Sequence, residues 1–287
     1  MNRKFSQQIA GNMGYRLPTA FDQEQEEFEK SQTNAMTKSL SLEEAGPKEK
    51  HVRTLIMGTY RNRGAEVFWL KLTSNIPLFA NEIVTWKFCI VLHRLMQDGD
   101  AKVIIGSIKH GSLIDEVCRS HTNIQKSAYG QLIGCYGKMI LDKLMFHNKN
   151  KMVPGNFSIK HAALENIDAG DMFELCVDFL DQIENTIKLM RTIFNSFEKG
   201  NKSLSLTKEG QCRLAALIPC THDSTRLLEL TTSLMRLLHL AIPWETLEGH
   251  RSRFGLFHGQ LRKIYEEMSH LIYLRSMVQI PSKYFYA

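Results

Sequence analysis

Apolar residues recur at intervals of three and four along most of this chain, and only 7 prolines interrupt its 287 residues. Such spacing places apolar side chains on one face of an α-helix. Residues 81–100 give a first example, in which one helix face would carry Val84, Phe88, Val91, Leu92 and Leu95. The pattern returns over residues 126–150, 168–200, 207–241 and 244–277, and the third of these is interrupted near Pro219.

Alternating patterns typical of β-strands are scarce, and the best candidate, residues 101–110, fits a helix equally well. We therefore predict an all-α fold from about residue 28 onward, built of about nine helices joined by short loops. So many helices exceed one four-helix bundle and are expected to stack as an α-α superhelix. The superhelix is expected to be irregular, because the chain contains no self-similar repeat.

Composition narrows the class of protein. No apolar run approaches the roughly 18 residues that a membrane span needs, and the N-terminus lacks the apolar core of a signal peptide. The 6 cysteines are scattered without a C-x-x-C pair, which is typical of reduced thiols in a cytosolic protein. The formal net charge of +6 is smaller than that of many nucleic-acid-binding domains, so the position of the positive charges matters more than their sum.

Sequence motifs for catalysis and metal binding are missing. The chain has no glycine-rich phosphate loop, no G-x-S-x-G nucleophile motif and no H-E-x-x-H zinc motif. His250 and His258 are too far apart in sequence to share a metal ion. Gly134 and Gly137 lie within a helical pattern, where they are expected to permit close helix packing. We therefore predict a non-enzymatic protein without a cofactor or a metal site.

Residues 1–21 differ from the rest, because they show little periodicity and contain two glycines and a proline. We predict a flexible segment here, followed by one helical domain over residues 22–287. A second interpretation stays open, because four apolar residues are spaced by four: Met1, Phe5, Ile9 and Met13. On a membrane they would form the inserted face of a short amphipathic helix, with basic residues on another face.

A basic cluster lies where a helix is expected to begin. Pro47 suits the first turn of a helix, which would place Lys48, Lys50 and His51 in that turn. Free backbone N–H groups and the helix dipole make this end positive, so cations there destabilise the isolated helix. The arrangement makes sense if an external anion is the partner. Lys38 ends the preceding helical pattern, and a short turn would return it to the side of Lys48.

An ordinary solvated basic turn explains this spacing equally well, and a family resemblance decides between the two interpretations. Lys38, nine intervening residues and then Lys48-Glu49-Lys50-His51 match the phosphoinositide signature of ANTH domains, K-x9-K-x-[KR]-[HY], at every fixed position. Residues 28–281 also resemble the ANTH domains of the huntingtin-interacting-protein and yeast Sla-type endocytic adaptors, in pieces such as WKFC, GQCRLA and LEGHR. The chain is less similar to the CALM-type assembly proteins.

This resemblance implies an ENTH/ANTH-like superhelix that binds phosphatidylinositol bisphosphate headgroups, such as phosphatidylinositol 4,5-bisphosphate. The implied headgroup ligands are Lys38, Lys48, Lys50 and His51. The family links membrane, clathrin coat and actin during endocytosis, so we expect a cytoplasmic protein at the plasma membrane and at clathrin-coated pits or vesicles. Clathrin and actin would be bound through regions absent from this chain, which we expect to be the membrane-binding portion or a short isoform. In the Sla-type branch, N-terminal insertion and co-assembly with an epsin-type ENTH domain are known.

A helical scaffold that binds peptide partners, with the basic cluster incidental, is the alternative interpretation. Nucleic-acid binding is less favoured, because no motif interleaves aromatic and basic residues. His51 beside phosphate groups should hold its proton, which predicts tighter headgroup binding at pH 6 than at pH 8.

Overall fold

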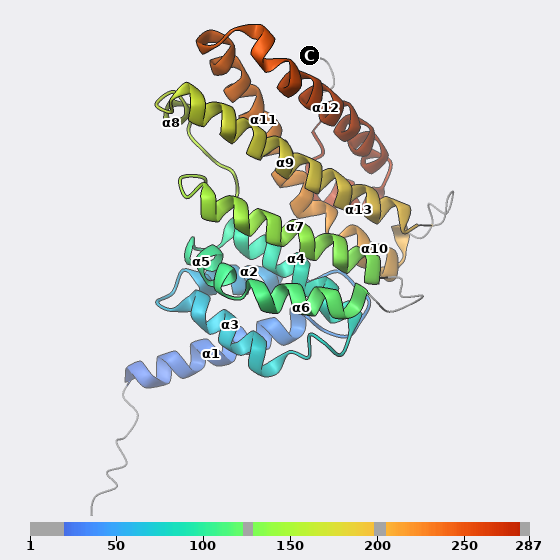
Figure 1. Cartoon of the computed structure of the whole chain (residues 1–287). Coiled ribbons are helices and arrows are strands. Elements are labelled where there is room, and N and C mark those ends of the chain that lie inside the picture. Colours follow the sequence, from blue (N-terminus) through green and yellow to red (C-terminus); the bar gives the residue numbers. More distant parts are fainter. Residues whose placement is uncertain (1–19, 123–128, 198–204, 282–287) are drawn as a thin grey trace, which may run out of the picture.

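The computed structural model describes residues 20–122, 129–197 and 205–281 (Figure 1). Its elements are α1 (Ala20–Ser39), α2 (Glu49–Thr59), α3 (Gly64–Asn75), α4 (Glu82–Asp98), α5 (Lys102–Lys109), α6 (Gly111–Thr122), α7 (Gly130–Lys149), α8 (His161–Leu164), α9 (Ala169–Asn195), α10 (Lys208–Leu214), α11 (Leu217–Ala241), the 3-10 helix η2 (Trp244–Leu247), α12 (Glu248–Ser269) and α13 (Ile272–Met277). No strand occurs within the described residues, which confirms the predicted all-α fold. Residues 101–110 contain α5.

The described part of the chain holds more helices than the nine or so expected. α8 is too short for apolar spacing to show in the sequence, and the pattern over residues 244–277 is divided between α12 and α13. The helices pack as an irregular superhelix: α1, α2 and α3 contact one another, α7 packs on α4, α5 and α6, and α9 lies against α7, α11 and α12 (Figure 1).

α4 is enclosed on nearly every side. The apolar face predicted for this helix is buried, and so are four of its polar side chains, Thr85, Lys87, His93 and Gln97. The helix begins at Asn81, whose side chain accepts hydrogen bonds from the backbone N–H groups of Ile83 and Val84. A buried helix must satisfy its polar side chains internally, so α4 becomes bonded to several neighbouring elements.

Two glycines bring α7 close to α6, as predicted. A Cβ atom added at Gly134 would lie 2.7 Å from Oγ1 of Thr122, and one added at Gly137 would collide with the Sγ of Cys118. The predicted interruption near Pro219 falls just before it. Pro219 lies in the first turn of α11, where its missing N–H breaks no helical hydrogen bond.

The N-terminal residues considered for membrane insertion, Met1, Phe5, Ile9 and Met13, lie outside the described residues. In the ranges that the structure does describe, none of the helices combines the length and hydropathy of a membrane span.

Candidate functional site

The four basic residues predicted from the sequence lie at the junction of α1 and α2. Lys38 is in the last turn of α1, and Lys50 and His51 are in the first turn of α2. Lys48 is the N-cap of α2, with extended backbone angles φ −70 and ψ 123. The expectation that Pro47 begins the helix is therefore wrong by two positions. The chain before it passes close to distant residues, because a Cβ atom added at Gly46 would lie 3.4 Å from Ala215 and 3.4 Å from Tyr273 of α13.

The electrostatics of His51 show that the four groups share one environment. Burial lowers the pKa of His51, and three neighbouring charges lower it further, those of Lys50, Lys38 and Lys48. The three lysines are exposed, and within the described residues none of them forms an ion pair. The cluster is therefore an uncompensated positive patch that an external anion would relieve.

Backbone groups at the start of α2 add to this patch. Lys48 offers no side-chain acceptor, so it caps none of the free N–H groups of the first turn. The acid in this turn, Glu49, is held by Arg94 of α4 through two hydrogen bonds of 3.1 Å. Arg94 also bonds to Asp98 on its own helix. Because Arg94 already neutralises the Glu49 carboxylate, the positive N-terminal end of α2 stays available to an anion from the solvent.

Lys87 of α4 fixes the loop that joins α1 to α2. Its side chain is only 1% exposed, and its Nζ donates to the carbonyl oxygens of Ser41 at 2.8 Å and Glu43 at 2.7 Å. A third bond of 3.1 Å goes to Oγ of Ser41. Burial lowers the pKa of Lys87, although the nearby Glu43 opposes this shift. Lys87 is thus a buried charge whose hydrogen bonds hold the loop from inside.

Two further side chains fasten the same loop. Tyr129 donates a hydrogen bond of 2.8 Å to Glu44, and Lys208 of α10 forms an ion pair of 2.8 Å with Glu43. The sequence interpretation missed Lys87, Tyr129 and Lys208. The signal for Lys87 was present, because it lies three residues after Val84 and four before Val91, within a buried helix face.

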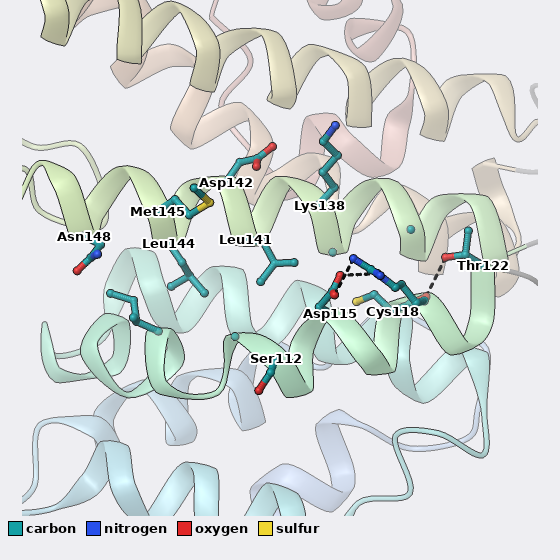
Figure 2. A pocket seen from close by; sticks show the side chains of 15 residues that line it. Ser112, Asp115, Cys118, Thr122, Lys138, Leu141, Asp142, Leu144, Met145 and Asn148 are labelled. Atoms are coloured by element: carbon teal, nitrogen blue, oxygen red, sulfur yellow. Dashed lines mark hydrogen bonds and ion pairs between the residues drawn. The ribbon is translucent and has the colours of Figure 1, made fainter.

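A groove of about 750 Å³ lies elsewhere, between α6 and α7 (Figure 2). Figure 2 shows Leu141 and Leu144 on its α7 side. Of its four charged residues, Asp115 and Arg119 are paired with each other on α6, and Lys138 and Asp142 lie on α7. None of the four predicted site residues lines it. The groove has no feature that points to a ligand.

The polar groups in the protein centre form a structural network. Asp223 of α11 accepts hydrogen bonds from His93 at 2.7 Å, from Gln97 at 2.6 Å and from Lys143 of α7. Burial alone would raise the pKa of the Asp223 carboxyl, but Lys143 and His93 hold it well below its usual range. All four side chains are buried, so this cluster joins α4, α7 and α11 and meets no substrate.

The chain is similar to known proteins along most of its length. Huntingtin-interacting protein 1 from Homo sapiens is 36% identical over 261 residues, which are 90% of this chain and 25% of that protein. Endocytosis protein end4 from Schizosaccharomyces pombe is 30% identical over 252 residues, which are 86% of this chain and 22% of that protein. The chain therefore spans about a quarter of the length of these relatives.

A solved chain described as the ENTH domain from epsin-2 in complex with phosphatidylinositol 4,5-bisphosphate has the same fold. It aligns with a TM-score of 0.82 at 28% identity, covering 89% of this chain and 98% of that one. The profile of the ANTH domain matches residues 31–282, which include the second half of α1, all of α2 and the basic cluster at their junction. The predicted resemblance is confirmed, and this chain belongs to the ANTH domain family.

Proposed function

We propose that this chain is the phosphoinositide-binding module of an endocytic adaptor and recruits it to the cytosolic face of the plasma membrane. The observation that carries the proposal is the basic cluster of Lys38, Lys48, Lys50 and His51, gathered from two helix ends by one internally fixed loop. The solved relative in complex with phosphatidylinositol 4,5-bisphosphate supports the choice of anion. The role is binding rather than catalysis.

The magnitudes favour direct headgroup contacts over general attraction. A basic residue near an anionic leaflet contributes about 1 kcal/mol, so four of them give about 4 kcal/mol and a dissociation constant near millimolar. Charge-assisted hydrogen bonds to phosphate oxygens contribute about 1.5–3 kcal/mol each. A few such bonds bring the dissociation constant to the micromolar range, which is suited to reversible recruitment.

The central test reverses two charges of the cluster. The double variant Lys48→Glu and Lys50→Glu is measured by co-sedimentation with phosphatidylcholine vesicles that contain or lack phosphatidylinositol 4,5-bisphosphate. Losing two contacts and adding repulsion costs about 4 kcal/mol, which lowers the vesicle affinity about a thousandfold. If the folded double variant sediments like the unmodified chain, the proposed site is wrong.

A matched control separates the site from net charge. Lys151 and Lys160, in the connection between α7 and α9, are exposed and form no ion pair with any described residue. The double variant Lys151→Glu and Lys160→Glu changes the net charge equally and should retain most of the binding. Retained capture of peptide partners without any vesicle binding by the unmodified chain would instead favour a protein-binding scaffold.

Several finer assignments belong to the same proposal. Binding at clathrin-coated pits, an epsin-type ENTH partner, and insertion of Met1, Phe5, Ile9 and Met13 into the bilayer would each strengthen a weak headgroup contact. Clathrin and actin would be reached through other parts of a longer adaptor. Deleting residues 1–19 should then weaken vesicle binding while leaving the binding of a soluble inositol polyphosphate unchanged.

A further inference from the structure

Two exposed leucines lie on the loop between α1 and α2 and on a segment bonded to that loop. Leu42 lies in the loop between α1 and α2 and is 66% exposed, and Leu206 lies just before α10 and is 61% exposed. Glu43, the residue after Leu42, and Lys208, two residues after Leu206, form an ion pair of 2.8 Å. The two leucines therefore flank one bridge that ties the two segments together.

The loop geometry holds Leu42 outward. Lys87 donates hydrogen bonds to the carbonyl oxygens of Ser41 and Glu43, so the backbone on both sides of Leu42 is fixed toward the protein interior. Leu40, two residues earlier, is buried. A large apolar side chain on a loop fixed in this way has no route back into the core.

Leu206 is exposed for a different reason. It precedes Thr207, the N-cap of α10, whose side chain accepts a hydrogen bond from the N–H of Gly210. An apolar residue at this position usually packs against the fourth residue of the helix. Here that residue is Gln211, so the expected apolar partner is missing and Leu206 stays in the solvent.

We propose that Leu42 and Leu206 enter the acyl region of an anionic bilayer while the neighbouring lysines hold its phosphates. Charge complementarity favours a lipid surface as the partner. Lys48 at the end of the α1–α2 loop and Lys50 in the first turn of α2 are exposed, and they suit a negatively charged lipid surface. Apolar side chains with cations beside them match the layered polarity of a bilayer, with phosphates above and hydrocarbon below. This inference rests on the proposed function and deepens it.

The first experiment removes the two side chains. The double variant Leu42→Ser and Leu206→Ser is compared with the unmodified chain on phosphatidylcholine vesicles containing phosphatidylinositol 4,5-bisphosphate, and on soluble inositol 1,4,5-trisphosphate. Burial of one leucine corresponds to about a tenfold change in affinity, so vesicle binding should weaken about a hundredfold. Binding of the soluble headgroup should not change.

A matched control uses an exposed leucine far along the chain. Leu240, at the end of α11, is 87% exposed. The Leu240→Ser variant should bind both vesicles and soluble headgroup like the unmodified chain. An equal loss of vesicle binding in this variant would show that any exposed leucine has the same effect, and would overturn the inference.

The second experiment measures depth directly. Trp69 and Trp86 are buried, so the Trp244→Phe variant has no exposed native indole that bromine in the acyl chains could quench. In that background, the indole of a Leu42→Trp variant should be quenched by vesicles whose acyl chains carry bromine. The indole of a Leu240→Trp variant should not be quenched.

The outcomes separate this inference from the proposed function. If Lys48→Glu with Lys50→Glu abolishes vesicle binding but the serine variant binds normally, the insertion of the leucines is wrong and the proposed function stands. If the lysine variant binds normally, the proposed function itself fails. If the serine variant also loses the soluble headgroup, or the Leu42→Trp indole is not quenched, the leucines act on the fold or on a protein partner, and the inference is overturned.

Discussion

Replacing Lys87 by methionine tests whether a residue without headgroup contact sets the geometry of the site. The Lys87→Met variant removes three hydrogen bonds from the loop, to Ser41 and Glu43. Bonds from a charged donor contribute about 1.5–3 kcal/mol each. Burial of the ammonium opposes this gain, as the lowered pKa of Lys87 shows. We therefore expect the free energy of unfolding to fall by about 2–4 kcal/mol.

The same change should weaken headgroup binding in the folded protein. Without Lys87, the residues from Ser41 to Glu43 must be ordered again on binding, at about 1–2 kcal/mol each. The Glu43–Lys208 ion pair and the hydrogen bond from Tyr129 remain and limit the loss. An increase of about ten- to a hundredfold in the dissociation constant is expected. Calorimetric titration with soluble inositol 1,4,5-trisphosphate measures it, and urea unfolding gives the stability.

A second buried lysine provides the control. Lys143 lies in the central network, bonded to Asp223, and does not touch the α1–α2 loop. Lys143→Met should also lower the free energy of unfolding, while the affinity of the folded molecules for the headgroup stays unchanged. The reasoning about the loop is refuted if Lys87→Met binds the headgroup like the unmodified chain, or if Lys143→Met weakens binding equally.

Three further measurements test the site and the core. Burial and the neighbouring lysines lower the pKa of His51 in the free protein, and a bound phosphate raises it, so binding takes up a proton and the affinity should rise from pH 8 to pH 6, by up to about tenfold per unit of pKa difference. The same titration with the His51→Gln variant measures the contribution of phosphate ionisation, which is then subtracted. Equal pH profiles for both proteins would rule out a direct contact. Asp223→Asn leaves the Lys143 charge buried without its carboxylate and should lower the free energy of unfolding in urea by about 3–5 kcal/mol; a change below about 1 kcal/mol would contradict the network. Gly137→Val places a side chain against Cys118 and should lower the melting temperature, whereas an unchanged value would mean that α6 moves away freely.

Local sequence patterns predicted the helices and the gathering of basic residues at the junction of α1 and α2, because both depend on near neighbours in the chain. The apolar spacing of residues 81–100 gives α4, and the short distance from Lys38 to Lys48 leaves room only for a tight connection between α1 and α2. The error at Pro47 has a distant cause. The preceding glycine passes close to Ala215 and Tyr273, and no local pattern contains these distant neighbours.

The side chains that support the site were beyond this kind of reasoning. Lys87 reaches the loop from 44 or 46 positions away, Tyr129 from 85 and Lys208 from 165. Which distant residues meet is decided by how the superhelix stacks, and apolar spacing does not encode that stacking. A lysine inside a buried helix face does indicate an internal hydrogen-bond partner, but it does not predict which loop supplies that partner.

The enclosure of α4 has a mechanical consequence. Its side chains bond to the α1–α2 loop through Lys87, to α2 through Arg94, to Cys212 of α10 through Trp86 at 2.9 Å, and to Pro219 of α11 through Gln97 at 2.8 Å. Tension between a membrane held at the loop and a load attached to the later helices would pass along this one helix. A force parallel to α4 would load the hydrogen bonds at its two ends at the same time. The domain should therefore resist this force better than a force across the helix, which would break the same bonds one after another.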